Sequence, residues 1–466
     1  MTNQQSLAIA ARFDRLPPSR TVWTMVMLIS LGGVFEFYDL FFTGYVAPGM
    51  VASGMFKPES LGIFAALAPT IAVAGFGTFV FATFAGLWLG TLVFGFVADR
   101  FGRRFIFTWS LIWYVVCTAI MAFQHSGQAI NLWRLIAGIG IGVELVTIDS
   151  YISELIPSGE RGRAYAVNQF ITFCVVPIVA FLAFILKDTH PFGLEYWRVV
   201  ILIGTLGAAF VWIIRRNVPE SPRWLARQGR VDEAERIVAD IEQRVEAEKG
   251  IKLPPPRPVG NEVEGRGSFS EIFGPLYLKR TILLSIFNMA QAIGFYGFAA
   301  WVPTLLISRG VHVTTSLQYA FIIAIANPFG PLLGTLFADK IERKTQICGG
   351  LLIMGIVIAL FSQASAPGLL ILLGVLFTLA SNVMSYAYHG YQAELFPTRV
   401  RARAVGFVYS WSRLAVAFAG LAIGVLLHKY GVPGVAVFIG ASMIVGICMI
   451  LLGPSTKGRA LESISH

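Results

Sequence analysis

The sequence predicts an all-α membrane protein with twelve transmembrane helices, divided into two pseudo-symmetric bundles of six. Three observations support this prediction: the composition, the long apolar runs and an internal repeat. Of the 466 residues, 56% are hydrophobic and only 13% are charged, and the mean hydropathy is +0.70. A soluble globular chain of this length needs more polar surface, so much of this chain must contact lipid.

Apolar runs long enough to cross a membrane recur along almost the whole chain. A transmembrane helix needs roughly 20 apolar residues, because each residue rises about 1.5 Å through a hydrocarbon core about 30 Å thick. The runs are continuous rather than alternating, which excludes a β-barrel. The stretch 58–75 either extends the second span or belongs to an outer loop. We predict spans at residues 23–47, 76–98, 105–124, 131–153, 164–186, 198–214, 281–307, 316–338, 346–364, 368–391, 404–427 and 433–453.

The chain repeats itself internally, because one shift of 240 residues maps polar residues of the first half onto the second. The shift carries like ends of helices onto each other, which predicts two parallel bundles related by an axis along the membrane normal. A solute site between the bundles is the expected consequence. The matched pairs are Asp99 with Asp339, Arg100 with Lys340, Arg103 with Arg343, Arg104 with Lys344, Tyr151 with Tyr391, Glu154 with Glu394, Pro157 with Pro397, Arg161 with Arg401, Arg163 with Arg403 and Ala164 with Ala404.

The polar segments divide the chain into five parts. We predict an N-terminal tail over 1–22, bundles over 23–214 and 280–453, a linker over 215–279 and a C-terminal tail over 454–466. The linker contains a charged, helix-prone stretch (VDEAERIVADIEQRVEAEKG), and we interpret it as soluble, with amphipathic helices whose charged face is solvated and has no partner.

The basic residues indicate the orientation. Six of the 36 Lys and Arg residues lie in predicted outer loops or outer helix ends and one, Arg413, lies inside a span, so 29 lie in the tails and alternate loops. By the positive-inside rule both termini and the linker are cytoplasmic. This placement accounts for the net charge of +10 without nucleic acid as a partner. Residues 1–20 have no apolar core, so we expect no cleaved signal peptide.

Several classes of chemistry are excluded by what the sequence lacks. The four cysteines fall within predicted spans without close pairing, so we expect packing residues rather than a metal site or a disulfide framework. A GxxxxGK[ST] signature is missing, so ATP hydrolysis is not the expected energy source. We see no catalytic constellation and predict no enzyme activity and no cofactor, with protons as the coupling ion.

Two motifs resemble the major facilitator superfamily. GFVADRFGRR at 95–104 is similar to its signature between helices 2 and 3, and a second copy, TLFADKIERK at 335–344, has Thr335 and Glu342 in place of glycines. PESPRWL (219–225) and GPSTKGRALE (453–462) resemble motifs of the sugar porter branch, with Ser455 where glutamate is usual. The resemblance covers nearly the full chain and implies solute transport by alternating access.

Other motifs resemble the metabolite:proton symporter branch, which carries organic acids and zwitterions. They are FEFYD at 35–39, followed by Gly44, and RLIAGIGIGVE at 134–144. By contrast, MAQAIGFYG at 289–297 keeps only Gln291 and Gly294 of the sugar porters' glutamine motif.

Acidic side chains in the first span are candidates for proton coupling. A charge at the bilayer centre costs at least about 2.5–3.5 kcal/mol, so such residues are functional by default. Glu36 and Asp39 share a helical face, and Arg134 is the expected partner of Asp39. We predict that Asp39 takes up a proton and releases Arg134, as the resemblance implies for related symporters. The alternative is a permanent structural ion pair. Glu144 is a further candidate.

Arg413 is the lone cation well inside a predicted span, so we expect it to face a cavity or to pair with an acid of its own half. A guanidinium offers a bidentate fork to a carboxylate, which favours an anionic substrate. Other candidates are polar or aromatic side chains of helices 7 and 10, although a Tyr or Trp near a helix end is more often an interface anchor. The predicted cavity residues are Arg413, Gln291, Asn288, Tyr296, Trp301 and Tyr388.

The repeated charged clusters predict a cytoplasmic gate. By the resemblance they form an ion-pair latch that must break for solute release, and the alternative is a purely structural loop network. The predicted gate residues are Gly95, Asp99, Arg100, Gly102, Arg103, Arg104, Glu154, Arg161, Arg163, Asp339, Arg343, Glu394, Arg401 and Arg403.

Together these features predict proton-coupled uptake of a small organic solute, specifically an organic acid anion, by a monomer in a bacterial-type inner membrane. Its partners would be the solute and membrane lipid. Proton-coupled efflux of drugs or metabolites, sugar uptake and a transporter-like solute receptor remain as alternatives.

Overall fold

The structure is a computed structural model that describes residues 8–9, 11–67, 72–94, 100–157, 160–207, 217–256, 268–337 and 341–455. Within these ranges every regular element is a helix, as the continuous apolar runs predict. Nine of the described helices are long and apolar enough to cross a membrane.

The first half and the linker contain helices in the order that the apolar runs predict. The first half comprises α2 (Arg20–Ala52), η1 (Pro58–Ser60), η2 (Gly62–Leu67), α3 (Ala72–Phe94), α5 (Arg103–Ala122), α6 (Gly127–Leu155), α7 (Arg161–Phe173), α8 (Val175–Leu186), η3 (Pro191–Gly193) and α9 (Tyr196–Gly204). The linker comprises α11 (Pro222–Arg227), α12 (Val231–Lys249) and η4 (Phe269–Phe273).

The second half repeats this order. It comprises α13 (Leu278–Ala299), α14 (Val302–Ser308), α15 (Val313–Ala324), α16 (Phe329–Phe337), α17 (Arg343–Gln363), α18 (Pro367–Glu394) and α19 (Thr398–Leu452).

Several predicted spans are interrupted or joined in the structure. Three of them each consist of two consecutive helices: α7 with α8, α13 with α14, and α15 with α16. The last two spans are joined in α19, where Gly431 breaks the helix with φ 63° and ψ −160°, a conformation that only glycine adopts readily. The stretch at 58–67 forms the 3-10 helices η1 and η2, so it is separate from the second span.

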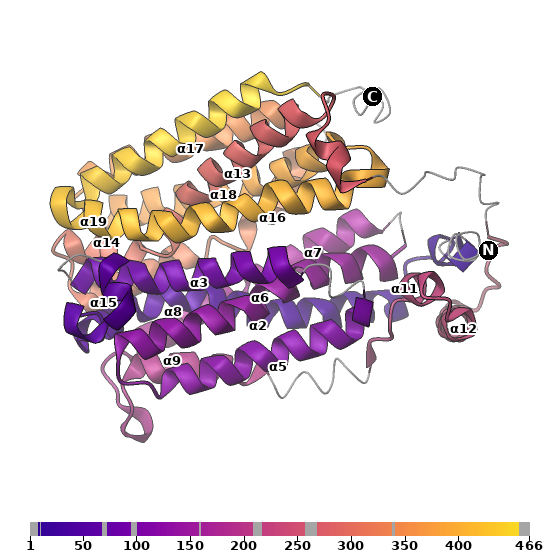
Figure 1. The fold of residues 1–466 in the computed structure, drawn as a ribbon, viewed down its shortest axis with the longest axis horizontal. Helices are drawn as coiled ribbons and strands as arrows, with labels where there is room; N and C mark the ends of the chain where they lie inside the picture. The colour runs from indigo at the N-terminus through magenta and orange to yellow at the C-terminus, as the bar shows by residue number, and fades with distance from the viewer. Residues whose placement is uncertain are drawn as a thin grey trace.

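The two halves lie side by side with their helices along the longest axis of the molecule (Figure 1). The N-terminus, α11 and α12 lie at one end of the bundle, which we call the terminal end, and α14 and α15 lie toward the opposite, distal end (Figure 1). Across the interface between the halves, α3 packs on α19, α8 on α15 and α2 on α14.

Glycines bring the two halves into direct backbone contact toward the distal end. A Cβ atom at Gly44 of α2 would lie 2.9 Å from the carbonyl oxygen of Ala300, and one at Gly77 of α3 would lie 2.7 Å from that of Gly420 in α19. Both distances are shorter than real Cβ contacts, so only glycine permits this approach. The distal end is therefore closed in this structure.

The linker helix α12 differs from the prediction, because it has a partner within the chain. Its apolar stripe, at the helical spacing of Ala234, Val238, Ile241 and Val245, is buried. Beside this stripe, Glu242 accepts hydrogen bonds from two arginines of the N-terminal segment. The sequence analysis missed this packing because the stretch is rich in charged residues. The four small or branched residues of the stripe are enough to pack one face of the helix against the rest of the chain.

The partners of α12 are Arg12 and Arg15. Arg12 Nη2 lies 2.5 Å from Glu242 Oε2 and Arg15 Nη2 lies 2.6 Å from Glu242 Oε1. Further along the helix, Glu248 accepts hydrogen bonds from the backbone N–H groups of Arg20 and Thr21, at 2.6 and 3.0 Å. A linker carboxylate thus caps the first turn of α2.

We expect Glu242→Gln to lower the free energy of unfolding by about 1–3 kcal/mol, because the charge-assisted hydrogen bonds from Arg12 and Arg15 are weakened. Burial alone would raise the pKa of Glu242, but the hydrogen bonds and charges of Arg12 and Arg15 lower this pKa below its ordinary value of 4.5. The stabilisation is therefore complete above pH 4.5 and is lost as the pH falls through the folded-state pKa.

The measurement is the thermal unfolding midpoint of the detergent-solubilised protein between pH 7 and pH 3. Asp240→Asn is the matched control, because Asp240 lies on the same helix but forms its ion pair with the exposed Arg244. Equal midpoints for the two variants at pH 7 would contradict the role of Glu242.

Candidate functional site

A buried ion pair between α2 and α6 lies inside the first half. Arg134 Nη1 lies 2.5 Å from Asp39 Oδ2, and both side chains are almost fully buried. Arg134 Nη2 also donates to the Asp39 carbonyl oxygen, at 2.7 Å. The structure thus brings together the two residues that the sequence suggested as partners.

Every polar atom of this pair has a partner. Arg134 Nε donates to Thr83 Oγ1 and Nη2 donates to Thr43 Oγ1, both at 2.9 Å. The second carboxylate oxygen of Asp39 accepts from Thr118 Oγ1 at 3.0 Å. The guanidinium lies 4.6 Å from the centre of the Phe42 ring. Because every polar atom has a partner, these contacts offset the cost of burying the two charges. If one partner is neutralised, the other charge stays buried without a counter-charge, which is costly.

Two further carboxylates are buried near this pair. Glu36 and Glu144 have no exposed surface, and Glu144 lies within electrostatic range of Glu36 and Asp39. Neither side-chain oxygen of Glu144 has a hydrogen-bond partner among the described residues, and neither does the buried Tyr114 hydroxyl. A carboxylate without donors is costly to bury in its charged form, which makes Glu144 suited to accept a proton.

Arg413 in α19 is the buried cation of the second half. Its Nη1 donates to the Tyr296 hydroxyl at 2.9 Å and its Nη2 donates to the Tyr409 hydroxyl at 3.1 Å. Its guanidinium carbon lies 5.6 and 5.0 Å from the centres of these two rings. Within the described part of the chain no carboxylate lies within ion-pair distance of Arg413, and its Nε has no partner. The expected pairing with an acid of its own half is therefore not found there.

Gln291 and Tyr388, two of the predicted cavity residues, contact each other beside this group. Gln291 Nε2 lies 3.5 Å from the Tyr388 hydroxyl, and the Tyr388 ring stacks on His389 with 4.2 Å between centroids. His389 in turn lies 5.6 Å from Tyr409, the partner of Arg413. Of the predicted groups, Tyr296 therefore contacts the guanidinium directly, whereas Tyr388 and Gln291 are linked to it through His389 and Tyr409.

Asn288 and Trp301 lie elsewhere. Asn288 Nδ2 donates to Gln392 Oε1 at 2.7 Å, so its amide joins α13 to α18. Trp301 lies between α13 and α14, is buried, and packs edge-to-face on Phe76 of the first half at 5.2 Å. Trp301 follows the end of α13, so the Trp301 indole is part of the closed distal end and does not line the cavity.

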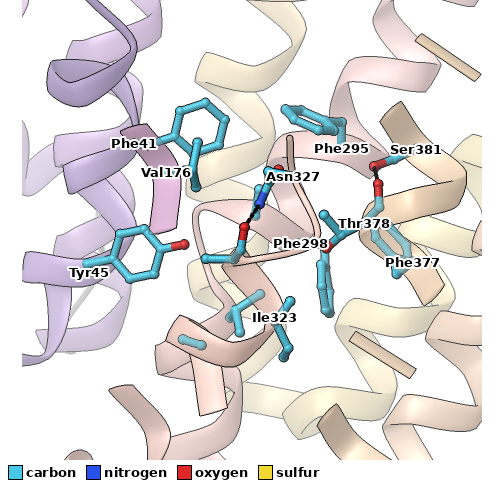
Figure 2. Close-up of a pocket in the computed structure, with 14 residues that line it drawn as sticks. Phe41, Tyr45, Val176, Phe295, Phe298, Ile323, Asn327, Phe377, Thr378 and Ser381 are labelled. Atoms are coloured by element: carbon cyan, nitrogen blue, oxygen red, sulfur yellow. Dashed lines mark hydrogen bonds between the residues drawn. The ribbon is translucent and has the colours of Figure 1, made fainter. Parts of the chain in front are cut away.

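A pocket opens between the halves, and none of the predicted cavity residues lines it (Figure 2). Its outline takes in about 370 Å³ of space between atoms, part of which is open to solvent. Five of its lining residues are aromatic: Phe41, Tyr45, Phe295, Phe298 and Phe377. Its polar lining residues are Asn327, Thr378 and Ser381, together with the Tyr45 hydroxyl. The sequence offered one signal, since Phe41 and Tyr45 are four residues apart and share a face of α2 with the acidic motif.

The ion pairs at the terminal end repeat in both halves. Arg103 Nη2 lies 3.0 Å from Glu154 Oε1, and Arg343 Nε lies 2.7 Å from Glu394 Oε1. These are the same pair at the shift of 240 residues. Each joins the start of the third span of its half to the end of the fourth.

Two further gate arginines also repeat their contacts. Arg161 Nε donates to the carbonyl oxygen of Ile156 and Arg401 Nε to that of Phe396, both at 3.1 Å. The remaining predicted gate residues are mostly at the surface. Arg100, Arg163 and Arg403 are exposed, while Gly95, Asp99 and Asp339 lie outside the described residues.

Glu220 contacts two of the predicted gate arginines, and the sequence analysis did not single it out. It accepts hydrogen bonds from the backbone N–H groups of Arg103 and Arg104, at 2.9 and 3.1 Å. Gly102, with φ 100°, turns the chain so that these groups face it. Burial raises the pKa of Glu220 above its ordinary value, although these hydrogen bonds oppose the rise. The PESPRWL motif was the available signal.

Two six-helix halves with buried charges and a pocket between them define a polytopic membrane transport protein. The comparisons with known proteins agree. The family model described as "Sugar (and other) transporter" matches residues 25–466. The chain belongs to this family of the major facilitator superfamily.

The chain is similar to several transporters along its whole length. It is 30% identical to the putative metabolite transport protein YdjK of Escherichia coli, covering 98% of this chain and 96% of that one. It is 25% identical to the niacin transporter NiaP of Acinetobacter baylyi, covering 98% and 99%. The xylose transporter XylE of E. coli, solved in a partially occluded inward open conformation, matches with a TM-score of 0.75 at 21% identity, covering 95% and 100%. The structural likeness shows the twelve-helix fold alone.

Proposed function

We propose that this transporter carries a small organic anion together with protons across a bacterial cytoplasmic membrane, as a monomer and by alternating access. The main support is the buried Arg413, which has tyrosine hydroxyls rather than a carboxylate as partners among the described residues. A buried cation without an anionic partner is costly. The carboxylate of a solute would supply the missing negative charge.

Proton coupling is assigned to the Asp39–Arg134 pair, with Glu36 and Glu144 as neighbouring proton acceptors. Protonation of Asp39 removes the charge that neutralises Arg134, so it changes the balance between two arrangements of the helices. The structure of XylE that is titled as a proton:xylose symporter supports proton coupling in proteins of this fold. Protons are then the only coupling species, and no cofactor is needed.

The proposed direction is uptake, with the terminal end in the cytoplasm. The basic residues of the tails and alternate loops support this orientation. The distal end, where glycine-lined backbones touch, would then be the closed periplasmic side. The gate pairs Arg103–Glu154 and Arg343–Glu394 lie at the cytoplasmic side in this arrangement, where they would break and re-form during the cycle.

An anion is favoured over a sugar by the site and by one of the named relatives. NiaP is named as a transporter of niacin, a carboxylic acid. A sugar presents many hydroxyl groups and no charge, so it would leave Arg413 without a counter-ion. Sugar uptake remains the second candidate, because the Gln291–Tyr388 contact resembles the amide and aromatic groups that bind neutral solutes.

The test is the internal pH of proteoliposomes that contain the purified protein. Carboxylates, sugars, amino acids and organic cations are added singly under an inward proton gradient. We expect carboxylates alone to acidify the lumen beyond the leak of empty liposomes. If sugars acidify the lumen and carboxylates do not, sugar uptake replaces the anion proposal. If neither class acidifies the lumen, proton-coupled uptake of carboxylates and of sugars is contradicted.

A further inference from the structure

We infer that the pocket between the halves binds a planar aromatic or heteroaromatic ring, so that the transported anions are aromatic carboxylates. This inference rests on the proposed function and narrows its substrate class. It is based on the side chains that line the pocket, on their remaining hydrogen-bonding capacity and on a row of rings that leads to Arg413.

The walls of the pocket are flat and apolar. Phe41 and Tyr45 come from α2, Phe295 and Phe298 from α13, and Phe377 from α18 (Figure 2). Aromatic rings prefer offset-stacked or edge-to-face neighbours, and the walls already pack in this way: Phe41 lies edge-on to Phe295 at 6.3 Å. An inserted ring finds the same geometry on several sides.

Three of the four polar groups of the pocket already donate a hydrogen bond within the protein. Thr378 Oγ1 donates to the Gly374 carbonyl oxygen and Ser381 Oγ to that of Thr378, both at 2.9 Å. Asn327 Nδ2 donates to the Ala324 carbonyl oxygen at 3.0 Å. Thr378 and Ser381 thus use their donors within α18, whereas Asn327, in the turn between α15 and α16, uses one of its two amide N–H groups; Figure 2 shows the bonds of Ser381 and Asn327 as dashed lines.

The Tyr45 hydroxyl is the exception. Its side chain is only 6% exposed, its hydroxyl has no hydrogen-bond partner among the described residues, and it points toward the space beside Asn327 (Figure 2). A ligand with one acceptor, such as a ring nitrogen or a ring oxygen substituent, satisfies this donor. A polyhydroxylated solute would lose most of its hydrogen bonds to water against phenyl walls, which costs affinity.

A row of contacting rings connects the pocket to the cationic site. Phe41 contacts Phe295, and Phe295 lies edge-on to Tyr296 with 4.7 Å between centroids. Tyr296 is the residue whose hydroxyl receives the hydrogen bond from Arg413. Arg413 therefore lies beyond Phe295 as seen from the pocket. We expect a solute whose ring occupies the pocket to direct its carboxylate toward that side.

The experiment measures the Kd of purified protein by calorimetry for benzoate, 4-hydroxybenzoate, pyridine-3-carboxylate and cyclohexanecarboxylate. Benzoate and cyclohexanecarboxylate have the same charge and similar size, and they differ in planarity. We expect wild type to bind the three aromatic acids at least about tenfold more tightly than cyclohexanecarboxylate. Equal affinities would overturn the inference but leave the proposed function intact. If none of the four acids binds, the inference is overturned, and the proteoliposome assay decides the proposed function separately.

Two variants locate the ring. Tyr45→Phe removes one hydroxyl and keeps the wall, so we expect about tenfold weaker binding of the two acids that carry a further acceptor and little change for benzoate. Phe377→Leu removes a wall and should reduce the preference for aromatic acids over cyclohexanecarboxylate. Phe418→Leu is the matched control, because Phe418 is 56% exposed and lies outside the pocket. Wild-type affinities in both pocket variants would overturn the inference.

Discussion

Replacing Asp39 by asparagine is expected to reduce proton-driven uptake to the level of liposomes without protein, while solute exchange at equal pH continues. Asparagine is nearly isosteric with aspartate, so its side-chain oxygen can still accept a hydrogen bond from Arg134. It cannot bind or release a proton, and the coupling step is lost. The measurement is solute uptake under an inward proton gradient, alongside exchange of labelled for unlabelled solute without a gradient.

The conservative substitution matters because the pair is buried. Removing the side chain of Asp39 entirely would take away its hydrogen bonds to Arg134 together with the charge, at a cost of about 3–5 kcal/mol, and loss of folding would obscure the transport result, whereas asparagine keeps an acceptor for Arg134. Asp188→Asn is the control, since the side chain of Asp188 is 76% exposed and pairs only with Lys187. Full gradient-driven uptake by Asp39→Asn would show that the pair is structural.

Replacing Arg413 by glutamine is expected to weaken binding of the transported anion by at least about 30-fold. Truncating one partner of a buried, hydrogen-bonded charge pair costs about 2–5 kcal/mol, and each 1.4 kcal/mol is a factor of about ten in Kd. Arg413→Lys should fall between wild type and Arg413→Gln, because an ammonium keeps the charge but lacks the planar fork. The measurements are Kd for the substrate and the KM of uptake.

The control for Arg413 is Lys429→Gln, which removes a basic charge at an exposed position near the distal end. Asp39→Asn serves as a second reference, since it is expected to lose gradient-driven uptake while keeping the substrate affinity. Unchanged affinity in Arg413→Gln would mean that the anion is bound elsewhere and that the guanidinium only holds Tyr296 and Tyr409 in place.

The sequence was sufficient for most of the fold, because lipid imposes long apolar helices and a duplication preserves polar positions. The shift of 240 residues predicted that Arg343 is the counterpart of Arg103. In the structure each arginine pairs with the equivalent glutamate of its own half, Glu394 and Glu154 respectively. The proximity of Asp39 and Arg134 was also predictable, since each buried charge needs a partner and few exist in these spans.

The aromatic pocket was not predictable from the sequence. The chain has 37 phenylalanines, and apolar periodicity does not distinguish a ring facing lipid from one in the core or one lining a cavity. The burial of α12 was missed for a related reason, because its charged residues outnumber the four that pack. The sequence analysis assigned Trp301 to the cavity, because no charged residue just before it indicates that α13 has already ended.

The proposed proton-coupling residues and most of the pocket lining belong to different copies of the duplicated bundle. Asp39, Arg134 and Glu144 lie on α2 and α6 of the first half, whereas Phe41, Tyr45 and Val176 are the first half's share of a pocket lined mainly by the second. In the proposed function, the first copy couples protons and the second copy contributes most of the residues that recognise the solute. Divergence within the second copy can therefore change the cargo while the ion-coupling machinery is inherited unaltered, and chimaeras that exchange second halves between relatives are a direct route to new substrate ranges.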